Sequence, residues 1–201
     1  MNATVLHYTH PKLISRELAE VCYEVLTQNC VFDVHSVASA PDEPRTVQNM
    51  YKTILRGLEG IQTKYVFLAE HDVLYPTYHF GHRLKSAQYS IHVYTMDAER
   101  AWVANRKILA GFSGEVEALG AALEQRVARI DAGHKFKWSE IFRETRDTYV
   151  SAAPLVDIRH GKNLTGARRP AGAERYPYGW DRKLINRVRK AMEAGNAQEQ
   201  L

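Results

Sequence analysis

The sequence predicts a three-layer α/β fold with a mostly parallel central sheet and antiparallel strands added at its edge. In the first 70 residues, short segments rich in β-branched and aromatic residues alternate with longer amphipathic segments of helical period. Beyond Pro76 the pattern changes to short, closely spaced apolar segments, which is typical of antiparallel strands. The 201 residues suffice for one domain and a tail. We expect a domain over residues 1–165 and a basic extension over residues 166–201.

The first half is predicted to form strand, helix, strand, helix, strand. A strand over residues 5–8 precedes a helix over residues 12–28, with Pro11 in its first turn. A second strand follows over residues 30–38. The next helix begins at the capping residue Thr46 and runs to about residue 63, and a third strand covers residues 65–69. Units of this kind join parallel strands.

The second half is predicted to add antiparallel strands and further helices. The expected elements, in order, are strands over residues 89–95 and 101–109, a long helix opened by residues 113–115, a helix over residues 138–149, a strand over residues 154–158, a loop over residues 166–174 and a terminal helix over residues 184–192.

The composition is that of a globular protein and argues against several other classes of protein. Apolar residues make up 45% and charged residues 25%, as in ordinary globular proteins. No apolar run approaches the roughly 20 residues of a membrane span, and the N-terminal residues lack the pattern of a secretion signal. Two cysteines suggest neither a disulfide framework nor a zinc site, and Cys22 has the spacing of a buried helical residue. We therefore expect a cytoplasmic protein without a membrane span; nothing in the sequence determines its oligomeric state.

Positive charge is concentrated in the last third, although the net charge is only +4. A solvated basic surface explains this pattern, and so does binding of a polyanion or of a donor's phosphates. The basic residues concerned are Lys135, Lys137, Arg143, Arg146, Arg159, Lys162, Arg168, Arg169, Arg175, Arg182, Lys183, Arg187, Arg189 and Lys190.

The segment Tyr65-Val66-Phe67-Leu68-Ala69-Glu70-His71-Asp72 carries the strongest functional signal. A buried strand stops at two carboxylates, Glu70 and Asp72, and ligands of open α/β sheets bind beyond the carboxyl ends of strands. Carboxylates there suit a hard divalent cation that also holds phosphates. Neither a G-x-G-x-x-G fingerprint nor a P-loop follows the first strand, so a nucleotide would bind without those motifs.

This layout resembles the GT-A-fold glycosyltransferases, in which an acid-any-acid motif closes a hydrophobic strand. The segment Val156-Asp157-Ile158-Arg159-His160-Gly161-Lys162-Asn163 is similar to the late segment of that family. The resemblance implies a Rossmann-like GT-A fold and a transferase that moves a sugar from a nucleotide-diphosphate donor, with a UDP-sugar expected, to an acceptor hydroxyl. It also implies Mn²⁺ or Mg²⁺ bound by Glu70, Asp72 and His160.

Further roles follow from the same resemblance. Asp72 would stabilise the leaving group through the metal ion, and Glu115 would serve as the catalytic base, with Asp97 and Glu117 as alternatives. The donor's base and ribose would lie near Tyr8, Thr9 and Gln48. Arg159 and Lys162 would add positive charge beside the diphosphate.

Other interpretations of these residues stay open. The two acids are also typical of a solvated turn, and Glu115 of a first-turn residue that faces the helix dipole. His71 is expected to point away from the acids, in a structural role. A nucleotidyltransferase would need a glycine-rich loop after the first strand, which is missing. A nucleic-acid-binding module that uses the basic third is the second rival, and the two ideas combine if the acceptor is a modified DNA base.

Overall fold

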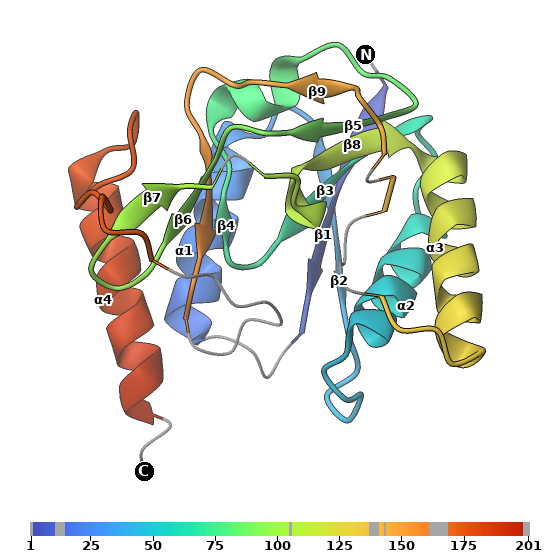
Figure 1. Cartoon of the computed structure of the whole chain (residues 1–201), viewed down its shortest axis with the longest axis horizontal. Helices are drawn as coiled ribbons and strands as arrows, with labels where there is room; N and C mark the ends of the chain where they lie inside the picture. Colours follow the sequence, from blue (N-terminus) through green and yellow to red (C-terminus); the bar gives the residue numbers. More distant parts are fainter. Residues whose placement is uncertain are drawn as a thin grey trace.

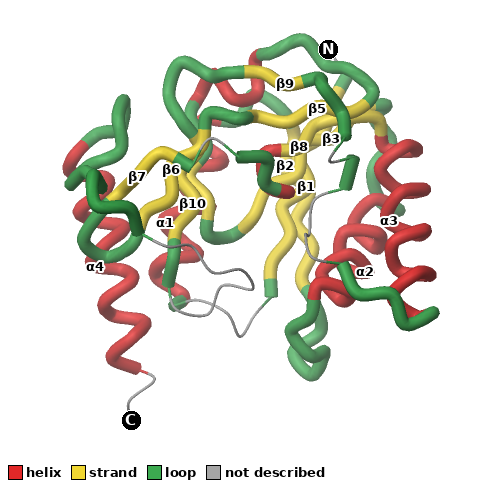
Figure 2. The backbone as a smooth tube through the Cα atoms, viewed as in Figure 1, coloured by secondary structure: helices red, strands yellow, loops and turns green. Residues whose placement is uncertain are grey.

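The computed structural model describes residues 2–10, 15–104, 106–136, 141–142, 144–160 and 169–198 and shows two β-sheets flanked by helices (Figure 2). The six-stranded sheet has the order β2 (Asp33–Ala38), β1 (Ala3–Thr9), β3 (Tyr65–Glu70), β8 (Phe112–Glu115), β5 (Ala87–Ser90) and β9 (Thr148–Tyr149). The four-stranded sheet has the order β4 (Val73–Leu74), β10 (Leu155–Ile158), β6 (Val93–Met96) and β7 (Ala101–Val103). The α/β class with a mostly parallel first half is therefore confirmed.

The parallel half has the predicted order of elements, but its first helix begins at Arg16 rather than residue 12, and its second helix ends at Leu58 rather than near residue 63. Strand β1 pairs in parallel with both β2 and β3. The connecting helices are α1 (Arg16–Asn29) and α2 (Val47–Leu58). Ser15 and Thr46 cap them, each side-chain oxygen accepting a hydrogen bond from the backbone N–H three residues later.

Antiparallel strands extend the six-stranded sheet, but their bounds differ from the prediction. Residues 89–95 are not one strand, because the chain leaves the first sheet after β5 and enters the second at β6. All eight residues of these two strands are buried, so the sequence pattern gives no sign that the strand is interrupted between them. The strand expected over residues 101–109 ends at Val103, and the 3-10 turn Leu109–Gly111 precedes β8.

Helices cover both sides of the molecule (Figure 1). Helix α2 and helix α3 (Val116–Asp131) pack on one face of the six-stranded sheet, against apolar residues of β1 and β3. Helix α1 and the terminal helix α4 (Arg182–Gln198) pack together and against the four-stranded sheet. The predicted terminal helix is thus confirmed. Its buried residues Ile185, Val188 and Met192 share a core with Leu18, Val21 and Cys22 of α1.

The prediction of a helix over residues 138–149 is wrong for the part of that segment that the structure describes. Residues 141–142 and 144–147 form bends and turns, and Thr148–Tyr149 is the short edge strand β9. The 3-10 helix Thr77–Gly81 completes the fold between β4 and β5. Over the described ranges, no helix is long and apolar enough to cross a membrane.

Candidate metal and phosphate site

The candidate site lies where the chain passes from the six-stranded sheet into the four-stranded sheet. Strand β3 ends at Glu70, His71 and Asp72 form the turn, and β4 begins at Val73. Strand β10 runs antiparallel to β4, with Val73 opposite Asp157, and the N–H of Ile158 donates to the carbonyl of Asp72 at 3.0 Å. This pairing brings His160, which follows two residues after the end of β10, beside Asp72.

Three potential metal ligands meet at this turn. The Nε2 atom of His160 lies 3.2 Å from Oδ2 of Asp72. One ligand atom each from His71, Asp72 and His160 lies within 4.8 Å of the others. Ligands about 2.1 Å from one transition-metal ion are at most about 4.2 Å apart, so small side-chain movements would let the three share an ion.

His71 is the member that sequence reasoning missed. It was expected to point away, yet it faces Asp72. Both ring nitrogens are buried, and neither makes a hydrogen bond of normal geometry with the residues that the structure describes. Buried polar atoms are almost always satisfied, so a bound group is expected to use at least one of these nitrogens. The residues present therefore fit a divalent cation.

Glu70 does not join this group, which differs from the predicted set of Glu70, Asp72 and His160. The alternation of β3 puts Glu70 on the face that carries Val66 and Leu68, and its register partner on β1 is Tyr8. The Tyr8 hydroxyl contacts the Glu70 carboxyl. Burial and the nearby charge of Asp72 raise the pKa of Glu70 to about 8. A carboxyl that stays protonated near neutral pH is a poor metal ligand.

The ionisation states of Asp72 and His71 favour metal binding. Burial raises the pKa of Asp72, but His71, His160 and Arg159 outweigh that effect and hold it below its ordinary value. Burial lowers the pKa of His71. An ionised carboxylate and a neutral imidazole are the forms that coordinate metals.

Two arginines lie beside this cluster and are fixed by one buried carboxylate. Asp157 Oδ2 accepts a hydrogen bond from Arg159 at 2.6 Å and another from Arg106 at 2.9 Å. Burial and the charge of Asp72 raise the pKa of Asp157, while the two arginines oppose that rise. Arg159 was predicted as a phosphate-binding residue. Arg106 was missed, since a lone arginine after an edge strand carries no motif.

A third arginine, Arg45, enters from the loop before α2. It is close enough to Asp72 and His71 to interact with their charges, and its Nε atom is buried without a hydrogen bond to the described residues. Arg45, Arg106 and Arg159 thus bring positive charge to the cluster from three segments. Converging cations are what a phosphate group requires.

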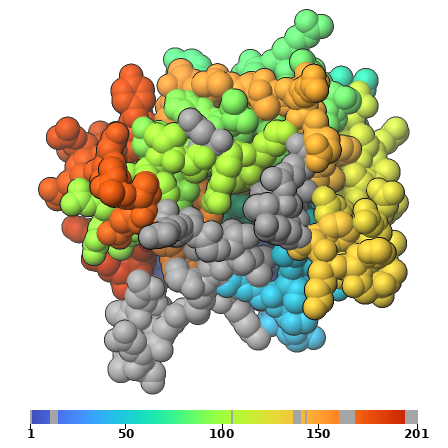
Figure 3. All heavy atoms as spheres, viewed as in Figure 1, coloured from blue at the N-terminus to red at the C-terminus, as the bar shows by residue number. Residues whose placement is uncertain are grey.

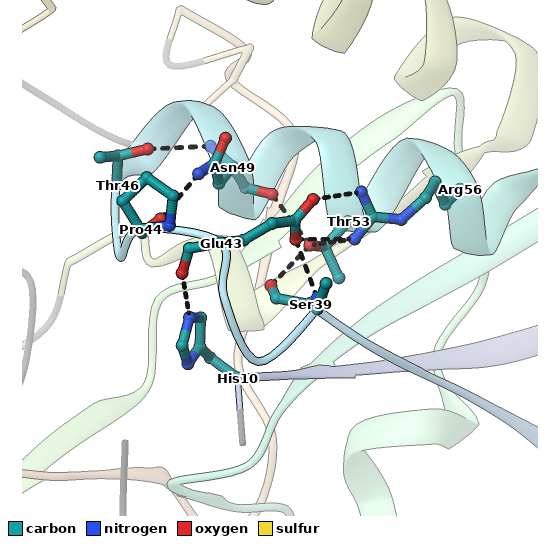
Figure 4. Close-up of polar contacts among 9 residues, drawn as sticks. His10, Ser39, Glu43, Pro44, Thr46, Asn49, Thr53 and Arg56 are labelled. Atoms are coloured by element: carbon teal, nitrogen blue, oxygen red, sulfur yellow. Dashed lines mark hydrogen bonds and ion pairs between the residues drawn. The ribbon is translucent and has the colours of Figure 1, made fainter. Parts of the chain in front are cut away.

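Hydrogen bonds hold the loop that carries Arg45 (Figure 4). Glu43 accepts two hydrogen bonds from Arg56 of α2, at 3.0 and 3.1 Å, and one from the N–H of Ala40. Its carbonyl lies 3.1 Å from a ring nitrogen of His10. Asn49 donates to the carbonyl of Pro44 at 2.7 Å. The two residues before Arg45 are therefore tied to α2, and Thr46 after it caps that helix.

Of the predicted donor-binding residues that the structure describes, some lie near the cluster and others do not. Tyr8 and Thr9 end β1 at the same edge of the sheet as Glu70, as expected. Gln48 lies in the first turn of α2, where its amide donates to Asp131 at the end of α3. Lys162 lies outside the described residues.

Glu115 is not brought to this site. Strand β8 runs antiparallel to β3, so Glu115 pairs with Tyr65, at the opposite end of β3 from Asp72. Its carboxylate forms an ion pair with Lys64 at 3.1 Å. Glu117 follows in the first turn of α3. Asp97 lies at the site's edge of the second sheet, where Arg169 binds it at 2.6 Å.

Comparisons with known proteins bear on the fold. No protein-family model matches the chain, and no curated protein matches it. Among solved structures, a glycosyltransferase involved in the glycosylation of the major capsid of PBCV-1 is similar, with a TM-score of 0.52 and 13% identity over 96% of this chain and 100% of that one. The chain therefore has a Rossmann-like fold of the kind that this glycosyltransferase has.

Proposed function

We propose that this protein is a metal-dependent glycosyltransferase that uses a nucleotide-diphosphate sugar. The observation that carries the proposal is the cluster of His71, Asp72 and His160, surrounded by three arginines at the carboxyl edge of a glycosyltransferase-like sheet. Metal ligands and phosphate-binding cations in one place suit a diphosphate bridged to a cation. A UDP-sugar is the donor that we would test first.

The ligand set favours Mn²⁺ over Mg²⁺. Mg²⁺ prefers six oxygen ligands, whereas imidazole nitrogens suit transition metals. One carboxylate and two imidazoles therefore select against Mg²⁺. The same ligand types hold iron(II) in other proteins, so a metal panel should include Fe²⁺.

The protein residues would bind and orient the leaving diphosphate. A divalent cation at the cluster would supply charge that stabilises the diphosphate as the glycosidic bond breaks. Asp157 keeps the guanidinium groups of Arg106 and Arg159 in fixed positions, so they can meet phosphate oxygens without being reordered. Arg45, in the loop before α2, would add a third positive charge beside the cluster. Tyr8 and Thr9 would face the nucleoside.

Calorimetric titration with nucleoside diphosphates tests this proposal. Uridine, guanosine, cytidine and deoxythymidine diphosphates are titrated into the wild-type protein with Mn²⁺, with Mg²⁺, with Fe²⁺ under anaerobic conditions and with EDTA. We expect one nucleotide to bind with Mn²⁺ and to bind at least tenfold more weakly with EDTA, since about 1.4 kcal/mol of metal-bridged contact suffices for that factor.

Two matched carboxylate variants give the control. Asp72→Asn should lose the metal-dependent binding, while Glu115→Gln, at the far end of β3, should keep it. If a folded wild-type protein binds no nucleotide under any of these conditions, or if Glu115→Gln loses binding as Asp72→Asn does, the proposal fails.

A further inference from the structure

A second cationic cluster lies on the C-terminal segment, and we call it the Tyr176 cluster: Arg175, Tyr176, Arg182 and Arg189. The guanidinium carbons of the three arginines lie 5.5, 5.4 and 5.2 Å from the centre of the Tyr176 ring. Arg182 and Arg189 are seven residues apart on α4, so they share one face of the helix. Asn186, between them on that face, accepts a hydrogen bond from the Tyr176 hydroxyl at 3.3 Å.

This cluster holds positive charge without a carboxylate partner among the described residues. Arg189 is 92% buried, and it donates one hydrogen bond, to the carbonyl of Arg175, while its Nε atom has none. Burial and the neighbouring Arg175 and Arg100 lower the pKa of Arg189. Tyr176 and Asp97 act in the other direction but do not outweigh them. Asp97 is itself bound by Arg169. A buried cation that forms no direct ion pair is costly, so such an arrangement favours an incoming anion.

An exposed aromatic ring lies next to these arginines in the chain. Tyr178 is 69% exposed. Gly179 follows it with a φ of +77°, a conformation that side chains disfavour, and an added Cβ would approach the Cβ of Ala153 to 3.2 Å. This turn allows Trp180 to dock, its ring nitrogen donating to the carbonyl of Pro154 at 2.9 Å, while Tyr178 stays in solvent. Arginines combined with an exposed aromatic ring are typical of single-stranded nucleic-acid sites.

The cluster and the metal site open on the same edge of the four-stranded sheet. Met96 pairs with Ile158 of β10 and with Ala101 of β7, and Arg159 donates to the carbonyl of Met96. Arg100, whose charge acts on Arg189, is in the turn between β6 and β7. Neighbouring strands are about 5 Å apart, so β10 and β7, which are two strands apart, lie about 10 Å from each other. Figure 3 shows the orange and red C-terminal segment against green atoms of residues near 100.

We propose that the Tyr176 cluster binds the phosphodiester backbone of single-stranded nucleic acid, with Tyr178 stacking on a base. This goes beyond the proposed sugar transfer and does not depend on it, because binding at the cluster requires neither metal nor nucleotide. If both proposals hold, the nucleic acid is a candidate acceptor.

Fluorescence anisotropy with a labelled 20-nucleotide single-stranded DNA, in EDTA and over a salt series, tests the proposal. The variant Arg175→Ala/Arg182→Ala removes two exposed cluster arginines and leaves Arg189 in place. The control Lys183→Ala/Lys190→Ala removes the same charge from exposed positions of α4 outside the cluster. Thermal melting verifies that both are folded. A duplex of the same sequence and vesicles with anionic phospholipid are run as parallel ligands.

The expected results separate the cluster from general surface charge. The wild-type protein should bind the single strand, and the cluster variant should bind about tenfold more weakly at 0.1 M salt, with a log–log salt slope shallower by about 1.4 for two lost phosphate contacts. The control should change less than threefold. Tyr178→Ala should weaken binding without changing the slope. Equal losses in both double variants, no binding by the wild type, or tighter binding to vesicles or to the duplex than to the single strand would overturn the proposal.

Discussion

At the residue scale, the proposal of a metal site depends most on His71. Its buried ring nitrogens make no hydrogen bond of normal geometry to the described residues, only a weaker contact with the Tyr8 backbone, and such a poorly satisfied group destabilises a folded protein unless something binds it. The sequence did not reveal this role, since a histidine between two acids is expected to alternate away from them. The turn at residues 71–72 ends the alternation of β3, so His71 and Asp72 face the same point.

Replacement of His71 by leucine should therefore raise the stability of the metal-free protein and abolish metal binding. Removing an unsatisfied buried polar group is worth about 1–2 kcal/mol, and urea unfolding in EDTA measures it. Mn²⁺ should stabilise the wild type and not the variant. The matched control is His79→Leu. His79 is equally buried but lies 2.9 Å from the Tyr149 hydroxyl, so this change should destabilise the protein. A His71→Leu protein that is less stable than the wild type in EDTA would contradict this interpretation.

Glu70 should make folding stability depend on pH. Burial and Asp72 raise its pKa from 4.5 to about 8. Below pH 4.5 the carboxyl is protonated in both the folded and the unfolded state and has no effect. Between pH 4.5 and 8 the carboxyl is protonated in the folded state and ionised in the unfolded state, so unfolding releases its proton. Glu70 therefore lowers the free energy of unfolding as pH rises, by up to about 1.4 kcal/mol per pH unit.

Unfolding of Glu70→Gln across this range measures the effect. The variant should gain stability over the wild type as pH rises from 5 to 8 and should match it near pH 4. Parallel stability curves for wild type and Glu70→Gln would show that folding does not raise the pKa of Glu70.

At the element scale, regular periodicity allowed prediction of the βαβαβ half, and pairing between distant segments limited the rest. Leu18, Val21, Cys22 and Val25 follow a helical period, so α1 could be read directly from the sequence. The direction of β8 could not be predicted from the sequence. Only the antiparallel pairing of β8 with β3 shows that Glu115 lies opposite Tyr65, at the start of β3. Likewise, Arg106 joins Arg159 through Asp157, a contact across 51 residues.

The loop before α2 should control nucleotide affinity through Arg45. Glu43→Gln weakens the two charged hydrogen bonds to Arg56 and lets the loop move. We expect about fivefold to tenfold weaker nucleotide binding with unchanged Mn²⁺ binding, since fixing a loop is worth about 1 kcal/mol. Calorimetry measures both. The control Glu24→Gln breaks an ion pair of similar length between α1 and α4 and should alter neither. Unchanged nucleotide affinity in Glu43→Gln would mean that Arg45 does not contact the donor.

At the scale of the whole molecule, the site arises from the meeting of the two sheets. Strand β3 belongs to one sheet and β10 to the other, and the short strand β4 joins them. The cluster thus needs residues 71–72 and residue 160 to be brought together by long-range pairing. The sequence indicated Asp72 as a candidate ligand from its place after a buried strand, and His160 through the family resemblance. It did not predict the exclusion of Glu70, which follows from its contact with Tyr8 across β1 and β3.

The most direct test of the account is a titration of Mn²⁺ followed by electron paramagnetic resonance, in which free Mn²⁺ gives a signal that protein binding removes. We expect one site per chain in the wild type, tightened by the nucleoside diphosphate that calorimetry selects. Asp72→Asn and His71→Leu should each lose that site, while Glu70→Gln should keep it. A wild-type protein that leaves the Mn²⁺ signal unchanged with and without nucleotide, or a site that survives His71→Leu but not Glu70→Gln, would contradict the central claim that His71, Asp72 and His160 hold the metal.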